Sequence, residues 1–159
     1  MNANDMIFIL LTGAGATALT DLWVVLRRRV FGTPLPNFGF VGRWVGHMAR
    51  GRFRHDSIAS AAPVRAERVI GWITHYLIGM TFALLLPAFW GRDWIHHPAL
   101  LPALIVGIVT VAAPFLVMQP AMGLKPSAAA RLSSLVLHAM FGLGLYVAGR
   151  VVSSLLVGG

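Results

Sequence analysis

The sequence contains no cysteine, few acidic residues and several long stretches without any charge. The absence of cysteine excludes disulfides, thiolate metal sites and cysteine-ligated clusters. Aspartate and glutamate together number five, against 13 lysines and arginines, so few carboxylates are available for general acid-base chemistry. The sequence also lacks a nucleophile elbow, a His-Glu-x-x-His motif and a P-loop. These absences favour a protein that is not an enzyme.

The charge-free stretches dominate a chain that is 57% hydrophobic and has a mean hydropathy of +0.76. A helix that crosses a bilayer needs about 20 mainly apolar residues, and four stretches are long enough. We therefore predict an all-α integral membrane protein, a bundle of four transmembrane helices that forms one membrane domain over residues 1–159. The predicted spans are residues 6–26, 69–90, 99–118 and 132–151.

The positive charges are distributed unevenly between the two sides of these spans. Nine of the 13 lysines and arginines lie within residues 27–68, and Lys125 and Arg131 flank the second loop on the same side. Only Arg92 and Arg150 lie on the opposite side. Because cytoplasmic loops carry the excess of positive charge, both long loops are predicted to be cytoplasmic and both termini external. This topology accounts for the net charge of +8, so nucleic acid is not expected as a partner.

The first cytoplasmic loop has a helical pattern over residues 40–50. Its apolar residues recur at helical spacing, and Arg43, His47 and Arg50 share the opposite face. Such a helix is expected to lie at the membrane surface and to contact anionic lipid headgroups, and Arg68 and Arg131 would extend this positive surface. Alternatively, the guanidinium groups recruit an anionic substrate to a site within the membrane.

The second and fourth spans share a repeated pattern, seen in RVIGWITHYLIG and RLSSLVLHAMFG. In both, an arginine is followed by a small residue, a histidine and a glycine at identical spacing. The matched residues are Arg68, Gly71, His75 and Gly79, and Arg131, Ser134, His138 and Gly142. The small residue, the histidine and the glycine are four apart, so they share one helix face. The repeat predicts two duplicated helix hairpins.

Three ionisable side chains are predicted at one depth. His75 and His138 lie about 10 Å, and Asp21 about 9 Å, from the cytoplasmic edge of their helices, and Gln119 ends the third span near that level. Pro114 is expected to free the carbonyl four residues before it. Because ionisable groups are costly in hydrocarbon, Asp21, His75 and His138 should converge in the bundle as a ligand-binding or proton-relay site with Gln119. In the alternative, Asp21 bonds a histidine and merely holds the helices together.

Four segments together resemble the bacterial membrane proteins of the domain of unknown function 2938 family. The segments are Gly42-Arg43-Trp44, Gly71-Trp72 with His75-Tyr76, Met118-Gln119-Pro120, and His138 with Phe141-Gly142-Leu143-Gly144-Leu145. The resemblance implies a small multi-span protein of the bacterial inner membrane. It supplies no activity, cofactor or catalytic residue.

Three functions remain open from the sequence. A small-solute, ion or proton transport or binding protein would use Asp21, His75 and His138, reached from the cytoplasm. A redox protein would use His75 and His138 as axial ligands of haem b or as partners of a quinone. An accessory subunit or scaffold would bind no ligand. Four spans form a small bundle, so a conducting path is expected to need a homodimer or larger assembly. The sequence does not indicate which metal, if any, the protein binds.

Overall fold

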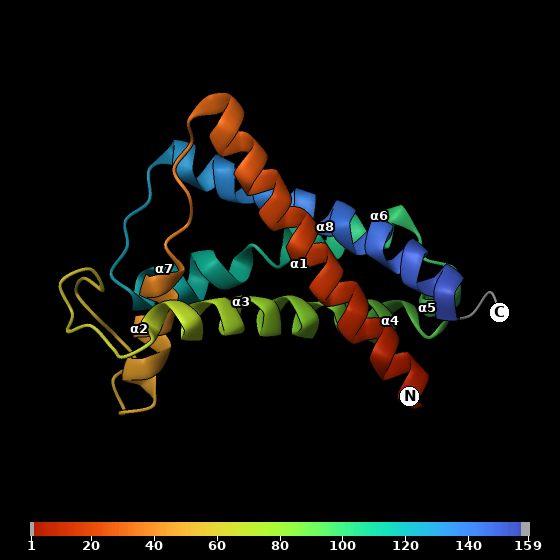
Figure 1. The fold of residues 1–159 in the computed structure, drawn as a ribbon, viewed down its shortest axis with the longest axis horizontal. Coiled ribbons are helices and arrows are strands. Elements are labelled where there is room, and N and C mark those ends of the chain that lie inside the picture. Colours follow the sequence, from red (N-terminus) through yellow and green to blue (C-terminus); the bar gives the residue numbers. More distant parts are fainter. Residues whose placement is uncertain (1, 157–159) are drawn as a thin grey trace.

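A computed structural model describes residues 2–156, and within that range every regular element is a helix. Four helical segments are long and apolar enough to cross a membrane, which confirms the four helices predicted from the sequence. They are α1 (Ala3–Phe31), α3 with α4 (Glu67–Ala83 and Leu85–Trp90), α6 with the π-helix η1 and α7 (Leu100–Val109, Ala113–Met118 and Gln119–Ala121), and α8 (Ala128–Leu156) (Figure 1). α1 and α8 extend several residues beyond both predicted ends.

The ends of α1 follow from its local sequence. The side chain of Asn2 accepts a hydrogen bond from the backbone N–H of Asp5 at 2.9 Å, and the Asp5 carboxylate accepts one from the Asn2 N–H at 2.9 Å. This reciprocal pair satisfies two of the N–H groups that a helix start leaves without partners. At the other end Gly32 adopts φ 66°, a left-handed conformation that glycine reaches at little cost and that terminates helices.

The four segments converge at one end of the molecule and diverge at the other (Figure 1). The start of α1 and the end of α8 lie at the convergent end, where α4 and the short helix α5 (Asp93–His96) complete the packing. Trp94 packs edge-on against Phe8, and the guanidinium of Arg92 bonds the Asp5 carboxylate at 3.0 Å. A continuous apolar core fills this region, so we call it the closed end.

Glycines set the distances between neighbouring helices. A Cβ atom at Gly13 of α1 would lie 2.5 Å from the Cα of Met80, the residue after Gly79 in α3. A Cβ atom at Gly107 of α6 would likewise lie 2.5 Å from the Cα of Gly142 in α8. Small residues therefore let the backbones touch, as is common where helices pack in lipid. The space beside Gly79 and Gly142 is consequently filled by a neighbouring helix.

Pro114 interrupts the third segment, as expected for a proline inside a helix. α6 ends at Val109, and the chain continues as the wider π-helix η1. The expected free carbonyl is absent, however: the Thr110 oxygen accepts a hydrogen bond from the Ala113 N–H at 3.1 Å. That prediction was wrong because the chain tightens by one residue just before the proline and recovers the bond.

At the divergent end, α2 (Phe38–Met48) packs against the first turns of α3. A Cβ atom at Gly42 would lie 2.7 Å from the backbone nitrogen of Gly71, so these two helices also touch through glycines. The loop after α2 pairs with the turn after α7 through hydrogen bonds from Ile58 to Met122 (2.9 Å) and from His55 to Ala121 (2.8 Å). We call α2 and residues 52–64 together the cap.

Candidate functional site

A cavity of about 280 Å³ lies between the diverging helices, beneath the start of α2. Residues from α1, α3, η1 and α8 form its walls, and most of its lining side chains are apolar. Its polar or titratable lining residues are Thr17, Thr20, Asp21, His75, Ser134 and His138. The structure therefore brings three of the four predicted site residues, Asp21, His75 and His138, to the wall of one cavity.

Asp21 of α1 and His75 of α3 are joined directly. The Nε2 atom of His75 lies 3.0 Å from Oδ1 of Asp21, and both side chains are about one-quarter exposed. The second carboxylate oxygen, Oδ2, is buried and has no hydrogen-bond partner among the described residues. The pair thus links two helices and leaves one buried carboxylate oxygen beside the cavity without a hydrogen bond among the described residues.

His138 of α8 has a different environment from its sequence counterpart. Its Nδ1 lies 2.9 Å from the backbone oxygen of Ser134, one helical turn earlier. A carbonyl oxygen only accepts hydrogen bonds, so Nδ1 donates, and Nε2 of the neutral ring remains an acceptor. His138 therefore contacts its own helix and does not pair with Asp21.

Gln119 does not line the cavity, although it was predicted to join the site. It begins α7, and its backbone oxygen accepts a hydrogen bond from Leu124 at 2.9 Å in the turn that follows. The neighbouring Met118 lines the cavity instead. The depth of Gln119 along the third span was predicted about correctly, but the π-helix changes the direction in which the residues after Pro114 project from the helix axis.

The start of the cap contributes a wall that the sequence argument missed. Pro36, Phe38 and Val41 line the cavity, and the Phe38 ring lies 4.4 Å from the His75 ring with an interplanar angle of 34°. The one local signal for this placement is Asn37, which caps α2 by accepting a hydrogen bond from the Gly39 N–H at 3.1 Å. This hydrogen bond at Asn37 fixes where α2 begins, but it does not reveal which residues the first turn of α2 contacts.

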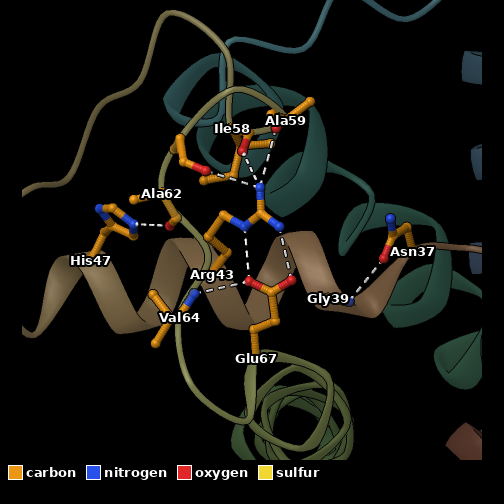
Figure 2. A network of polar contacts seen from close by, with 10 residues as sticks. Asn37, Gly39, Arg43, His47, Ile58, Ala59, Ala62, Val64 and Glu67 are labelled. Atoms are coloured by element: carbon orange, nitrogen blue, oxygen red, sulfur yellow. Dashed lines mark hydrogen bonds and ion pairs between the residues drawn. The ribbon is translucent and has the colours of Figure 1, made fainter.

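Arg43 occupies the centre of the cap and not its outer surface (Figure 2). Its guanidinium makes two bonds of 2.8 Å to the Glu67 carboxylate and three bonds of 3.0 to 3.2 Å to backbone oxygens. Those oxygens belong to Ile58, Ala59 and Ala61. The headgroup contact predicted for Arg43 does not fit this placement, because its side chain is only 10% exposed and each of its three nitrogens already makes a hydrogen bond.

His47 also points into the cap, with Nε2 2.9 Å from the oxygen of Ala62. Its ring lies 4.9 Å from that of His55, a buried residue whose two ring nitrogens have no partner among the described residues. The other three residues of the predicted basic surface, Arg50, Arg68 and Arg131, are exposed. The predicted basic face of α2 is therefore divided, with two residues inward and one outward.

Comparison with known proteins bears on the chain as a whole. No curated protein and no solved structure matches it. A family model described as protein of unknown function (DUF2938) matches residues 10–152, a range that includes most of α1 and α8, the whole of the two other long segments, the cap and every described residue that lines the cavity. The chain therefore belongs to the DUF2938 family.

Proposed function

We propose that this protein binds a small, mainly apolar solute at the cavity between α1, α3, η1 and α8, within a membrane, and exchanges a proton there. The observation that carries the proposal is that Asp21, His75 and His138 line one otherwise apolar cavity of about 280 Å³. Apolar pockets with a few convergent polar groups are typical of small-molecule sites. Histidine suits proton exchange because it titrates near neutral pH.

The proposal includes insertion in the bacterial inner membrane with the cap in the cytoplasm. Large apolar side chains are exposed on all four long segments, among them Leu11, Ile73, Leu101 and Leu155. Exposed apolar surface of this extent is unfavourable in water and expected in lipid. The excess of lysine and arginine at the divergent end supports the cytoplasmic side for the cap. Arg50, Arg68 and Arg131 are then the exposed contacts for anionic headgroups.

A purely structural role explains the three ionisable residues less well. The pair of Asp21 and His75 could hold α1 against α3, although such bonds contribute only about 0.6 kcal/mol on average in membranes. Among the described residues, however, His138 bonds only the backbone of its own helix and joins it to no neighbour. A half-buried imidazole at the cavity wall that stabilises no helix contact supports a ligand-binding role.

Of the two ligands considered for a redox protein, haem and quinone, the geometry favours the quinone. A bis-histidine haem needs a free ring nitrogen from each imidazole across a shared gap. His75 already uses Nε2 to bond Asp21, and a neighbouring helix occupies the position where a Cβ atom would project from Gly79 or Gly142. A quinone needs only hydrogen-bonding groups on an apolar wall, which this cavity has. A quinone is therefore the second candidate ligand.

The two hairpins of the proposed duplication cross in similar ways. α1 and α3 touch at Gly13 and Gly79, and α6 and α8 touch at Gly107 and Gly142. In both hairpins the second glycine follows a cavity-lining histidine by four residues. This correspondence supports a duplicated hairpin whose two histidines face a common space.

Solute binding can be tested with a cysteine placed in the cavity, because the natural chain has none. Ser134→Cys keeps the backbone oxygen that bonds His138, and Arg54→Cys in the exposed cap loop is the matched control. Alkylation by a maleimide is followed with four naphthalene probes: 2-naphthylmethylammonium, 2-naphthylmethanol, 2-naphthoate and 2,3-dimethyl-1,4-naphthoquinone. We expect at least one probe to slow alkylation at residue 134 and not at residue 54. Unchanged rates with all four would overturn the proposed function.

A further inference from the structure

The hydrogen-bonding groups that line the cavity are mainly acceptors. Asp21 uses Oδ1 to bond His75 and leaves Oδ2 buried without a partner among the described residues. The hydroxyl groups of Thr17 and Thr20 donate to backbone oxygens one turn earlier, at 2.8 and 2.9 Å, so only their lone pairs face a ligand.

His138 adds another acceptor on the opposite wall. Its Nδ1 proton is donated to the Ser134 oxygen, which leaves the Nε2 lone pair of the neutral ring available. The Ser134 hydroxyl can act in either direction. A ligand whose polar atoms only accept, such as a carboxylate or an oxidised quinone, finds few partners here. A ligand with N–H or O–H donors finds Asp21 Oδ2 and His138 Nε2.

The charge and the aromatic content of the cavity lining narrow the class of ligand further. Among the described residues that line the cavity there is no lysine or arginine, so an anion meets no permanently charged side chain there. Asp21 is the one carboxylate in this described lining, and three aromatic rings, Phe38, Phe82 and Phe141, share the walls with it. Aromatic faces attract cations, and in a water-poor site the attraction reaches about 2 kcal/mol per ring.

We infer that the ligand is an apolar amine in its protonated form, held through N–H donation to Asp21 Oδ2 beside the phenylalanine rings, and that it replaces a proton carried by His75. This inference rests on the proposed function, since it names the class of solute that the same cavity takes. It also gives the proton exchange a defined stoichiometry of one proton released for each cation bound.

The proton balance follows from the charges of Asp21 and His75. In the proposed exchange, the negative charge of Asp21 is matched before binding by a second proton on the ring of His75. When an ammonium group reaches Oδ2, two positive charges would face one carboxylate in a region of low dielectric constant, where such repulsion is strong. His75 therefore loses the proton from Nδ1 to water and keeps the Nε2 proton donated to Asp21. The net charge of the site is unchanged, and no covalent bond is made or broken.

The groups around His75 are consistent with a single exchangeable proton. Asp21 approaches it from α1, Tyr76 adjoins it on α3, and His138 lines the same cavity from α8. α2 presents the uncharged ring of Phe38, and the η1 residues in the lining are Ala113, Pro114 and Met118. Among the described residues, only Asp21 hydrogen-bonds the imidazole, so its carboxylate is the charge that the ring of His75 faces.

The inference can be tested with the naphthalene probes, which match in shape and differ in charge. The probes are titrated into the wild-type protein in nanodiscs by calorimetry in phosphate and in Tris. We expect 2-naphthylmethylammonium to bind about tenfold more tightly than 2-naphthylmethanol and to release about one proton, read from the difference in heat between the buffers. Its affinity should also rise with pH, by up to about tenfold per unit, while that of the alcohol stays constant.

Two variants separate the roles of the pair. Asp21→Asn keeps an oxygen for His75 and is expected to lose the preference for the ammonium probe while still binding the alcohol. His75→Gln is expected to bind the ammonium probe without proton release.

If the alcohol or the quinone binds as tightly as the ammonium probe, the inference fails and the proposed function stands. If no probe binds, the proposed function fails as well. Should either variant not fold, the pH dependence of ammonium binding to the wild-type protein still tests the inference.

Discussion

The side chain of Arg43 makes five hydrogen bonds, which join α2 to the cap loop and to the first turn of α3. Removing one partner of a buried ion pair leaves the other charge uncompensated. We expect Arg43→Ala to lower the free energy of unfolding by roughly 3 kcal/mol, the low end of the usual cost because Glu67 stays partly exposed. Tryptophan fluorescence during thermal unfolding in detergent measures the loss.

Two further variants separate geometry from charge at this position. Arg43→Lys keeps the charge but lacks the planar fork that bonds both Glu67 oxygens, so it should recover only a small part of the loss. Arg50→Ala removes an exposed arginine just beyond the same helix and should change stability by less than about 0.5 kcal/mol. Equal losses in Arg43→Ala and Arg50→Ala would contradict the buried role.

His55 is expected to make the cap sensitive to acid. Burial, followed by the nearby charges of Arg52 and His47, lowers the pKa of His55 below its ordinary value of 6.5. Below pH 6.5 the unfolded chain therefore takes up a proton at this position more readily than the folded one. Stability is complete above that pH and falls as the pH decreases from 6.5 toward the folded-state pKa.

The variant His55→Phe keeps an aromatic ring in the cap and removes the titration. Thermal unfolding measured between pH 5 and pH 7.5 should show a steeper loss at low pH for the wild type than for this variant. The other histidines are present in both proteins, so the difference between the two curves isolates His55. Parallel curves would show that this ring does not limit the cap at low pH.

For the helices as elements, the crossing of α1 and α3 fixes the distance between Asp21 and His75. Gly13→Ala places a methyl group against the backbone at Met80, 2.5 Å away, and no side-chain rotation can relieve that contact. We expect a loss of about 1 to 3 kcal/mol in unfolding free energy from this overpacking. In Gly15→Ala the nearest atom is the Cβ of Ala148 at 3.0 Å, so the neighbouring helix must shift by only a few tenths of an ångström and the loss should be smaller than for Gly13→Ala. Thermal unfolding of the two variants compares them directly.

The sequence predicted the elements well where the signal is local. Apolar length defined the four long segments, and the helical spacing of residues 40–50 predicted α2. The packing of α2 could not be predicted in the same way. Arg43 and Glu67 are 24 residues apart, and nothing in the helical pattern distinguishes an arginine that faces water from one that a distant carboxylate draws inward.

In the molecule as a whole, helix depth predicted part of the candidate site. Counting residues from the basic ends of the helices set Asp21, His75 and His138 at one level, and all three line one cavity. Depth carries no information on rotation about the helix axis, which is why Gln119 was assigned to the site and Phe38 was not. Rotation depends on the π-helix after Pro114 and on the docking of the cap, and both arise from tertiary packing.

The closed and divergent ends predict that the cavity is reached from one side only. Ser134 lines the cavity at the divergent end, whereas Ser153 is buried at the closed end, where its hydroxyl bonds the His96 oxygen at 3.1 Å. A membrane-impermeant maleimide should label Ser134→Cys in inside-out vesicles and not in intact cells. Ser153→Cys should stay unlabelled in both, and the exposed Ser154→Cys should react in intact cells. Labelling of residue 134 from the outside would reverse the proposed orientation, and equal labelling from both sides would mean that the closed end opens.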